Sequence, residues 1–268
     1  MMWRYAFSFL CLAGTAVAQD RVPSHCIALA QADPALHYVA FEDLPPDSVG
    51  LHYIGHASFL IDTGRIQSVT DFTGFIGTTG MIPDVVTMNH AHDSHWTAFP
   101  DPAIAHVLQG WGKFGEGVEH KLDLGEVLIR NVSTDIRSQF SGIEINGNSI
   151  FVFEAAGLCI GHLGHLHHEP DAEQYAVLGR LDVVMAPVDG GLTLDLPTMI
   201  RVLKRLKSSV VIPMHWFSEV ALRDFLRGMA DEFTVIEVGG PSLVMSLDRL
   251  SSRPQVMVLR PEWLLDAQ

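Results

Sequence analysis

The sequence predicts a mixed α/β (α+β) fold in which two β-sheets pack face to face, with helices outside them. Short apolar, β-branched segments dominate the chain up to residue 155, and helical and strand patterns alternate after it. Hydrophobic residues make up 48% of the 268 residues, ample for a large core. Strands early and helices late favour two layers, with the strands before residue 155 in one sheet and the later strands in the other.

In the first half, short strands are expected where apolar runs end at Gly or Asp turns. The expected strands are residues 51–54, 58–62, 65–70, 84–88, 104–109, 127–132 and 149–154. Asn146-Gly147-Asn148 is a turn signal, and it predicts the turn between the last two of these strands.

In the second half, apolar residues at helical spacing alternate with short buried runs. Helices are expected at 171–178, 197–206 and 219–229, and strands at 183–187, 209–213, 234–238 and 242–246. The chain shows no repeats, low-complexity tracts or long linkers, so residues 48–268 are predicted to form one domain.

The first residues have the features of a targeting segment. Arg4 supplies a positive start, and residues 5–16 form an apolar run too short to span a bilayer. Ala16-Val17-Ala18 is a small-x-small cleavage site, which predicts a signal peptide over residues 1–18 and a mature start at Gln19. Residues 19–47 would then be an N-terminal extension, and in a bacterium the mature protein would be periplasmic. The alternative is an uncleaved N-terminal anchor.

The formal net charge of −14 argues against nucleic acid and anionic membranes as partners, because both need a basic patch. A small-molecule substrate is expected instead, and the oligomeric state stays open. Cys11 would leave with the signal peptide. Cys26 and Cys159 could pair in an oxidising compartment, but the apolar run around Cys159 favours a buried free thiol.

The segment 89–95 carries three histidines directly after the buried strand expected at 84–88. They are His90, His92 and His95. Neutral imidazole is a common ligand for zinc-like metals, and a strand that ends in such a loop delivers imidazoles to a sheet edge. If the chain is still extended there, alternation places His90 and His92 on the same side. The alternative is a solvated polar loop.

Two further histidine segments also follow expected strands. Residues 162–168 contain four histidines, of which His165 is expected to point inward. His215 follows the strand expected at 209–213, with a core or capping histidine as its alternative. Because α/β sheets place their sites at the carboxyl ends of strands, the three segments are expected to meet at one edge.

Four motifs in this order carry a family resemblance. They are residues 55–60 (Gly-His-Ala-Ser-Phe-Leu), the histidine loop 89–95, residues 160–164 and residues 211–215. Together they resemble the metallo-β-lactamase superfamily, in its branch of metal-dependent hydrolases similar to ascorbate phosphate lactonase. The resemblance covers residues 48–217. It implies a four-layer αββα sandwich with one or two metals, commonly zinc, between the sheet edges.

The resemblance also implies a ligand set. Its members are His90, His92, His95, His165 and His215. Asp71 resembles an acidic residue that braces the histidine loop, with a simple turn aspartate as the alternative. Three positions depart from the family pattern: Ser94 stands at the loop aspartate, His165 at the bridging aspartate, and residues 132–137 contain no middle histidine.

These departures predict the metal content. A carboxylate between two cations offsets their repulsion, whereas a neutral imidazole at His165 carries no charge to do so. One zinc or another borderline divalent ion is therefore expected, with a second ion weakly held. Asp93 or Asp135 is expected to act as general base, with a purely structural role as the alternative for each. Arg137 and Lys113 are the basic residues expected near the loop.

The sequence therefore predicts an exported metal-dependent hydrolase that acts on an ester, lactone or phosphodiester through a metal-activated water. The alternative is a metal-binding protein without catalytic activity on the same fold.

Overall fold

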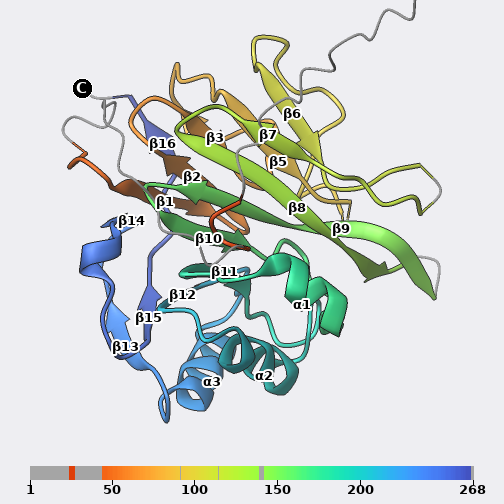
Figure 1. Ribbon diagram of the computed structural model, residues 1–268. Helices are drawn as coiled ribbons and strands as arrows, with labels where there is room; N and C mark the ends of the chain where they lie inside the picture. Colours follow the sequence, from red (N-terminus) through yellow and green to blue (C-terminus); the bar gives the residue numbers. More distant parts are fainter. Residues whose placement is uncertain (1–23, 28–43, 91, 114, 139–141, 267–268) are drawn as a thin grey trace, which may run out of the picture.

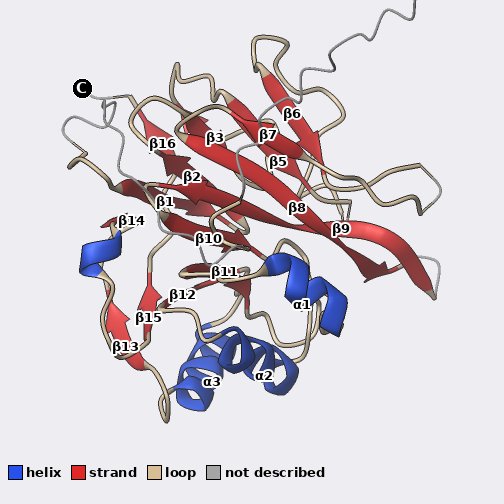
Figure 2. Cartoon of the chain, in the orientation of Figure 1, coloured by secondary structure: helices blue, strands red, loops and turns tan. Residues whose placement is uncertain are grey.

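The computed structural model describes residues 24–27, 44–90, 92–113, 115–138 and 142–266 (Figure 1). The expected signal peptide and most of the expected N-terminal extension lie outside these residues. The described chain forms two large sheets, a short strand pair and a few helices (Figure 2).

The first sheet has six strands. In spatial order they are β14 (Ser242–Met245), β1 (Val49–Gly55), β2 (Ser58–Asp62), β3 (Gln67–Val69), β5 (Val85–Met88) and β6 (His106–Gln109). The pairs from β14 to β3 are antiparallel, and those from β3 to β6 are parallel.

The second sheet has eight strands. In spatial order they are β13 (Thr234–Glu237), β15 (Gln255–Val258), β12 (Val210–Met214), β11 (Val183–Pro187), β10 (Leu158–His162), β9 (Ile143–Ala155), β8 (Val127–Arg137) and β7 (Lys121–Asp123). It is parallel from β13 to β10 and antiparallel from β10 to β7. A small pair, β4 (Gly77–Thr78) with β16 (Leu264–Leu265), lies apart.

The predicted division of the sheets at residue 155 is wrong. β7, β8 and β9 lie in the eight-stranded sheet with the later strands, and β14 returns to pair with β1. The reason is local: the tight turn at Ala156 and Gly157, both with positive φ, joins β9 to β10, so these strands must be neighbours in one sheet.

The turn predicted at Asn146-Gly147-Asn148 is also wrong. β9 continues through these residues to Ile143, and the pairing with β8 shifts register between Thr134 and Ile136. Asn146 has a φ of 54°, and its backbone N–H donates to the Asp135 carboxylate at 2.9 Å. The Asn-Gly signal therefore marks an irregularity inside a long hairpin.

The helices α1 (Ala172–Leu178), α2 (Leu196–Leu206) and α3 (Glu219–Met229) were expected near these positions. Side chains of Asp171, Asp195 and Ser218 cap their first turns by accepting backbone N–H groups. A short 3₁₀ helix, η1 (Leu247–Arg249), follows β14. In the part of the chain that the structure describes, α1–α3 lie against the eight-stranded sheet (Figure 1), and no helix is long and apolar enough to cross a membrane.

Three apolar cores hold these layers together. The central core between the sheets includes Phe59, Ile129 and Phe153. A second core packs the helices on the eight-stranded sheet, and a third lies under the loops that cover the outer face of the six-stranded sheet. Strands β11 and β12 are buried on both faces, which explains their continuous apolar sequences. The predicted mixed α/β sandwich is confirmed.

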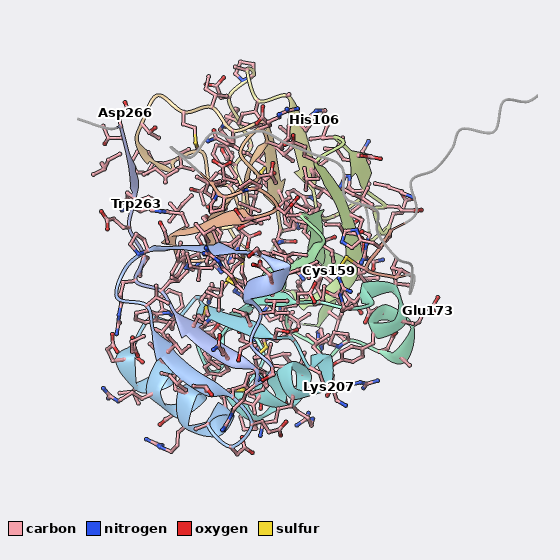
Figure 3. All side chains as sticks on the ribbon, turned by 60° about the vertical axis from the view of Figure 1, so that its left-hand side comes forward. His106, Cys159, Glu173, Lys207, Trp263 and Asp266 are labelled. Carbon is pink, nitrogen blue, oxygen red and sulfur yellow. A yellow bond between two sulfur atoms is a disulfide. The ribbon has the colours of Figure 1, made fainter. Side chains whose placement is uncertain are left out.

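Cys26 and Cys159 form a disulfide, so the predicted free thiol at Cys159 is wrong (Figure 3). The bridge joins residues 133 positions apart and ties the segment 24–27 to β10. Ser24 also donates to the Glu154 carboxylate at 2.5 Å. Closing so long a loop removes chain entropy from the unfolded state, which stabilises the fold by up to about 5 kcal/mol.

Candidate metal centre

Five histidines from both sheets meet at one edge of the sandwich. His56 lies in the turn between β1 and β2, and His92 and His95 follow β5 in the six-stranded sheet. His165 follows β10, and His215 follows β12 in the eight-stranded sheet. We call these five residues the histidine cluster. The predicted convergence of the histidine segments at the carboxyl ends of strands is thus present.

The ring nitrogens of the cluster are close enough to share one ion. His56, His92, His95 and His215 each offer a ring nitrogen, and these atoms all lie within 4.8 Å of one another. The Nε2 atoms of His92 and His165 are 3.1 Å apart. The His165 ring centroid lies 4.7 Å from that of His95 and 4.8 Å from that of His215.

Three of these histidines have their Nδ1 atom held by an oxygen. His95 Nδ1 lies 2.6 Å from Asp71 Oδ2, and His215 Nδ1 lies 2.9 Å from Asp189 Oδ2. His92 Nδ1 lies 2.7 Å from Ser94 Oγ. When Nδ1 donates to such an oxygen, the tautomer is set and the Nε2 lone pair is left for another partner.

Two of these Nε2 atoms fit a metal ion. His95 Nε2 and His215 Nε2 are buried and have no hydrogen-bond partner in the structure. Buried polar atoms in native proteins are nearly always satisfied, so each such atom calls for an explanation. A divalent ion bound by imidazole nitrogens at about 2.0–2.1 Å supplies one, and zinc prefers such donors.

The pKa values of His56, His95 and His165 are lowered, which favours their neutral form. Burial, reinforced by the neighbouring imidazoles, lowers the pKa of His56 to about 3. The same causes hold the pKa values of His95 and His165 well below their usual range. Neutral rings keep their lone pairs at physiological pH, as metal ligation requires.

The two carboxylates beside the cluster have opposite pKa shifts. Burial raises the pKa of Asp71 to about 6, although Asn89 donates to it at 2.7 Å. Burial would also raise the pKa of Asp189, but hydrogen bonds from His215 and Thr193 outweigh it and lower that pKa. Both carboxylates orient histidines.

The backbone at the cluster is held in a conformation that L-residues rarely adopt. His56, Asp71 and His215 have φ values of 54°, 43° and 54°. The His56 carbonyl accepts hydrogen bonds at 2.8 Å from both the His215 N–H and the Tyr53 hydroxyl. These bonds hold the backbone of His56 and His215 in place. Such residues cost about 1–3 kcal/mol each and gather at functional sites.

The structure places His90 outside the cluster, which corrects its expected position as a ligand. Its Nδ1 lies 2.7 Å from Glu144 Oε1, and its ring stacks on Trp111 with centroids 4.9 Å apart. The expected alternation needed an extended chain, but the backbone bends at His90. His90 and His92 therefore point to different surroundings.

Among the described residues, no hydrogen bond joins the carboxylates expected to act as general base to the cluster, although the charge of Asp93 acts on His92. Asp93 is exposed, and Asp135 accepts a hydrogen bond from the backbone of Asn146 inside the hairpin. Arg137 donates to the carbonyls of Gly191 and Thr193 at 3.0 and 2.8 Å, and Lys113 is exposed.

Two residues of the site were not predicted from the sequence. His56 lies in the motif of residues 55–60, but no ligand role was predicted for it, and none was predicted for Asp189. Asp189 directly follows a buried strand and precedes Gly190 and Gly191. A polar residue directly after a buried strand is also the signal that predicts His215, and the same signal predicts Asp189 as a site residue.

Two other histidines of residues 162–168, His162 and His167, make hydrogen bonds outside the cluster. His162 is fully buried, with Nε2 2.7 Å from the Ala57 carbonyl oxygen. His167 accepts from the Arg137 N–H at 3.1 Å and lies 2.8 Å from the Leu192 carbonyl oxygen.

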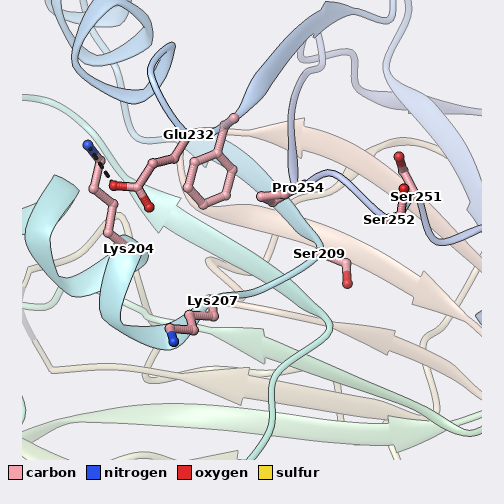
Figure 4. A pocket seen from close by; sticks show the side chains of 8 residues that line it. Lys204, Lys207, Ser209, Glu232, Ser251, Ser252 and Pro254 are labelled. Carbon is pink, nitrogen blue, oxygen red and sulfur yellow. Dashed lines mark ion pairs between the residues drawn. The ribbon is translucent and has the colours of Figure 1, made fainter.

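A cavity of about 320 Å³ lies at the opposite edge of the eight-stranded sheet (Figure 4). Its lining includes Lys207 and Ser209 before β12 and Pro254 before β15, at the amino ends of strands whose carboxyl ends point toward the cluster. Lys204 in this cavity is paired with Asp231 and Glu232. The histidine cluster is therefore the candidate site for chemistry.

Comparison with known proteins agrees with this geometry. Residues 50–215 match the model of the Beta-lactamase superfamily domain, so the chain belongs to that family. The predicted superfamily is thereby confirmed. Its ascorbate phosphate lactonase branch stays a prediction.

Relatives in several organisms carry the name UPF0173 metal-dependent hydrolase. The relative from Methanosphaerula palustris is 26% identical over 184 residues, covering 62% of this chain and 83% of its own. The relative from Alkaliphilus metalliredigens is 25% identical over 196 residues, which cover 62% of this chain and 84% of the relative.

Solved structures share the fold. One is a Thermotoga maritima protein assigned as a zinc-dependent hydrolase of the metallo-β-lactamase superfamily, with a TM-score of 0.55 and 23% identity over 80% of this chain and 100% of its own. Another is a metallo hydrolase from Ignicoccus hospitalis, with a TM-score of 0.53 and 18% identity over 80% and 96%.

Proposed function

We propose that the protein is a metal-dependent hydrolase with one divalent ion in the histidine cluster. The observation that carries this proposal is the arrangement of His92, His95 and His215. Each has Nδ1 held by an oxygen, and the Nε2 atoms of His95 and His215 are buried without a partner. The relatives named metal-dependent hydrolases support the same activity.

His92, His95, His165 and His215 are the residues that would hold the ion, with His56 beside them. Zinc fits this donor set, and another borderline divalent metal is the alternative. The bound ion would lower the pKa of a water molecule toward neutrality and polarise the substrate's carbonyl or phosphoryl oxygen.

One ion is proposed because the donors are uncharged. The four nitrogen donors within 4.8 Å of one another are imidazoles, and His165 adds a fifth. Two divalent ions a few ångströms apart repel strongly in a partly dry site, and a carboxylate bridge would offset that repulsion. Asp71 and Asp189 contact histidine Nδ1 atoms instead, so a second ion would be weakly held.

Ser94 links two members of the cluster. Its Oγ lies 2.7 Å from both His92 Nδ1 and His56 Nε2. If the His92 Nδ1–H donates to Ser94, the Ser94 hydroxyl is left to donate to His56 Nε2. This chain sets the orientation of both rings. It allows His92 to offer Nε2 to the ion.

Export to the periplasm is also proposed. The predicted signal peptide over residues 1–18 supports it, and so does the Cys26–Cys159 disulfide, because disulfides persist in oxidising compartments. Amino-terminal sequencing of protein from the periplasmic fraction should begin at Gln19. A start at Met1 in the cytoplasmic fraction contradicts this.

A metal-binding protein without catalysis is the second candidate. The observation in its favour is that Ser94 and His165 stand where the family pattern has carboxylates, while among the described residues no hydrogen bond joins Asp93 or Asp135 to the cluster. Such a protein would hold its metal without turning over any substrate.

The test combines metal content and turnover. Mature protein should contain one metal ion per chain by mass spectrometry and should hydrolyse ester or lactone probes. His95→Ala and His215→Ala should lose most of the metal and the activity, because each removes a buried donor. His90→Ala, from the same loop but outside the cluster, should keep its metal. Metal without turnover favours the second candidate, and loss of metal only in His90→Ala overturns the proposed site.

A further inference from the structure

Phe217 is an exposed aromatic residue at the histidine cluster. Its side chain is 62% exposed, yet its ring centroid lies 4.9 Å from that of His215 and 5.5 Å from that of His56. Large apolar side chains exposed beside polar residues mark binding surfaces when they adjoin a site.

The local chain explains how Phe217 reaches this position. His215 enters the cluster, and the next residue, Trp216, packs against the core under the helices. Phe217 then points away from that core, just before Ser218 caps α3. The ring is therefore held beside the cluster by a short segment that is anchored on both sides.

A second exposed apolar residue lies on the loop that orients His215. Leu192 is 59% exposed, and its backbone N–H donates to Asp189 Oδ1 at 2.6 Å. Its carbonyl oxygen lies 2.8 Å from His167 Nε2, and the ring of His167 is 4.6 Å from that of His165. Phe217 thus places apolar surface beside His215, and Leu192 is an exposed apolar residue on the loop whose backbone holds Asp189.

Apart from the proposed ion, the charged side chains that contact the cluster are carboxylates, which disfavour an anionic group on the substrate. Asp71 and Asp189 contact its histidines directly. Arg137 donates its guanidinium N–H groups to backbone carbonyls at Gly191 and Thr193. Arg260, over the Trp216 ring, is paired with Glu219 and Glu237. A phosphate group is normally held by Arg or Lys side chains whose donors face it. The formal net charge of −14 also repels anions.

We infer that the substrate is an uncharged carboxylic ester or lactone whose apolar acyl or aryl group packs on Phe217. This inference rests on the proposed hydrolase function. In the reaction the oxygen of water bonds to the acyl carbon, and the bond from that carbon to the alkoxy oxygen breaks. The alkoxy oxygen takes up a proton, so an ester gives a carboxylic acid and an alcohol, and a lactone gives a hydroxy acid.

The experiment compares probes on the metal-loaded mature protein. The probes are p-nitrophenyl acetate, butyrate and hexanoate, a medium-chain γ-lactone and bis(p-nitrophenyl) phosphate. The value of kcat/KM should rise from acetate to hexanoate and should be lowest for the phosphodiester. Phe217→Ala should lower kcat/KM for the hexanoate by about 10-fold or more, and that for the acetate much less, because a buried aromatic contact is lost.

Three controls accompany this series. Metal content of Phe217→Ala should equal that of the wild type, which separates substrate binding from site assembly. Phe217→Leu should recover much of the hexanoate activity. Phe75→Ala removes an exposed Phe that packs on Trp263 instead of the cluster, and it should leave every probe unchanged.

The outcomes separate this inference from the proposed function. Faster hydrolysis of the phosphodiester than of the esters, or equal loss on all probes in Phe217→Ala, overturns the inference and keeps the hydrolase. A metal-loaded protein that hydrolyses none of the probes contradicts the proposed function, and the inference with it.

Discussion

Two histidine–aspartate pairs face each other across the sandwich, and they differ in how the aspartate is held. His95 and Asp71 come from the six-stranded sheet, and His215 and Asp189 follow strands of the eight-stranded sheet. Side-chain exposure is 0% for Asp71 and 1% for Asp189, although Asp189 as a whole residue is less deeply buried than Asp71. Yet the pKa of Asp71 is raised and that of Asp189 is lowered.

The difference lies in the number of hydrogen-bond donors. Besides the histidine, Asp71 receives the Asn89 amide. Asp189 receives the backbone N–H groups of Gly191, Leu192 and Thr193, and the Thr193 hydroxyl at 2.7 Å. Donors stabilise the charged form and offset desolvation, so the loop after β11 makes Asp189 a firmly ionised partner. Of the two carboxylates that orient histidines, Asp189 is thus fully ionised and Asp71 can be neutral.

The largest expected effect is on metal affinity at neutral pH. Asp189→Asn should weaken metal binding by about 100-fold and Asp71→Asn by about 10-fold, within the range for carboxylates that orient metal-bound histidines. Asp189 loses more because its charge is the more firmly held. Competition with a chromophoric chelator measures both constants. Equal losses would show that the two pairs are equivalent.

The second effect is a pH dependence of stability in metal-free protein. Asp71 has a pKa of about 6 in the folded protein against 3.8 as a model group, so its folded form binds the proton more tightly. Its contribution to stability is therefore full below pH 4 and is lost as pH rises through 6, by about 3 kcal/mol.

Urea denaturation of wild type and Asp71→Asn between pH 4 and 7 measures this contribution. The wild-type free energy of unfolding should fall relative to that of the variant as pH rises. For Asp189 the lowered pKa places the change below pH 4, so the difference between wild type and Asp189→Asn should stay flat over the same range. A slope of the same sign for both would refute the comparison.

The third effect concerns Gly164→Ala, which disturbs the side of the cluster that holds the His95–Asp71 pair. A Cβ on Gly164 would lie 2.4 Å from Asn148 Oδ1 and 2.5 Å from Asn89 Nδ2, at a φ of 59°. Asn89 holds Asp71, and Asn148 accepts from the His165 N–H. Gly164→Ala should therefore cost about 1–3 kcal/mol of stability and weaken metal binding, measured by thermal unfolding and chelator competition.

The matched control is Gly191→Ala, beside Asp189. A Cβ there meets nothing within 4 Å, and the N–H that donates to Asp189 is kept. This variant should behave like the wild type. Wild-type metal binding in Gly164→Ala would mean that Asn89 and Asn148 do not set the geometry of the cluster.

The smallest effect concerns a single donor. Thr193→Val removes the hydroxyl that donates to Asp189 Oδ2 and leaves three backbone donors in place. It should cost about 1–2 kcal/mol and lower metal affinity several-fold, and Thr193→Ser should restore both. No change in either quantity would show that the backbone donors alone suffice for Asp189.

The sequence was sufficient for most of the elements and for the meeting of the histidine segments, but it missed the strands β4, β7, β15 and β16. Buried strands and capped helices have strong local signals, and the carboxyl ends of β10 and β12 bring His165 and His215 together. The assignment of strands to sheets was not predictable, because β14 pairs with β1, far away in the chain. Local periodicity carries no information on such pairing.

The ligand set was only partly predictable for a similar reason. His90 and His92 look alike in the sequence, but a bend in the loop sends His90 to Glu144 and Trp111. The disulfide depends on Cys26 approaching β10 in space, which its apolar neighbours do not reveal. The role of Asp189 depends on a loop whose backbone N–H groups converge on one carboxylate.

The central claim is that one ion lies among His92, His95, His165 and His215, with Asp71 and Asp189 behind the rings. Anomalous diffraction from crystals of metal-loaded protein, at the absorption edge of the bound metal, tests it most directly. The account predicts one strong peak per chain, about 2.0–2.1 Å from imidazole nitrogens of these four residues, with no carboxylate oxygen at ligand distance. A peak at His90 and Glu144, or two equal peaks bridged by a carboxylate, would contradict it.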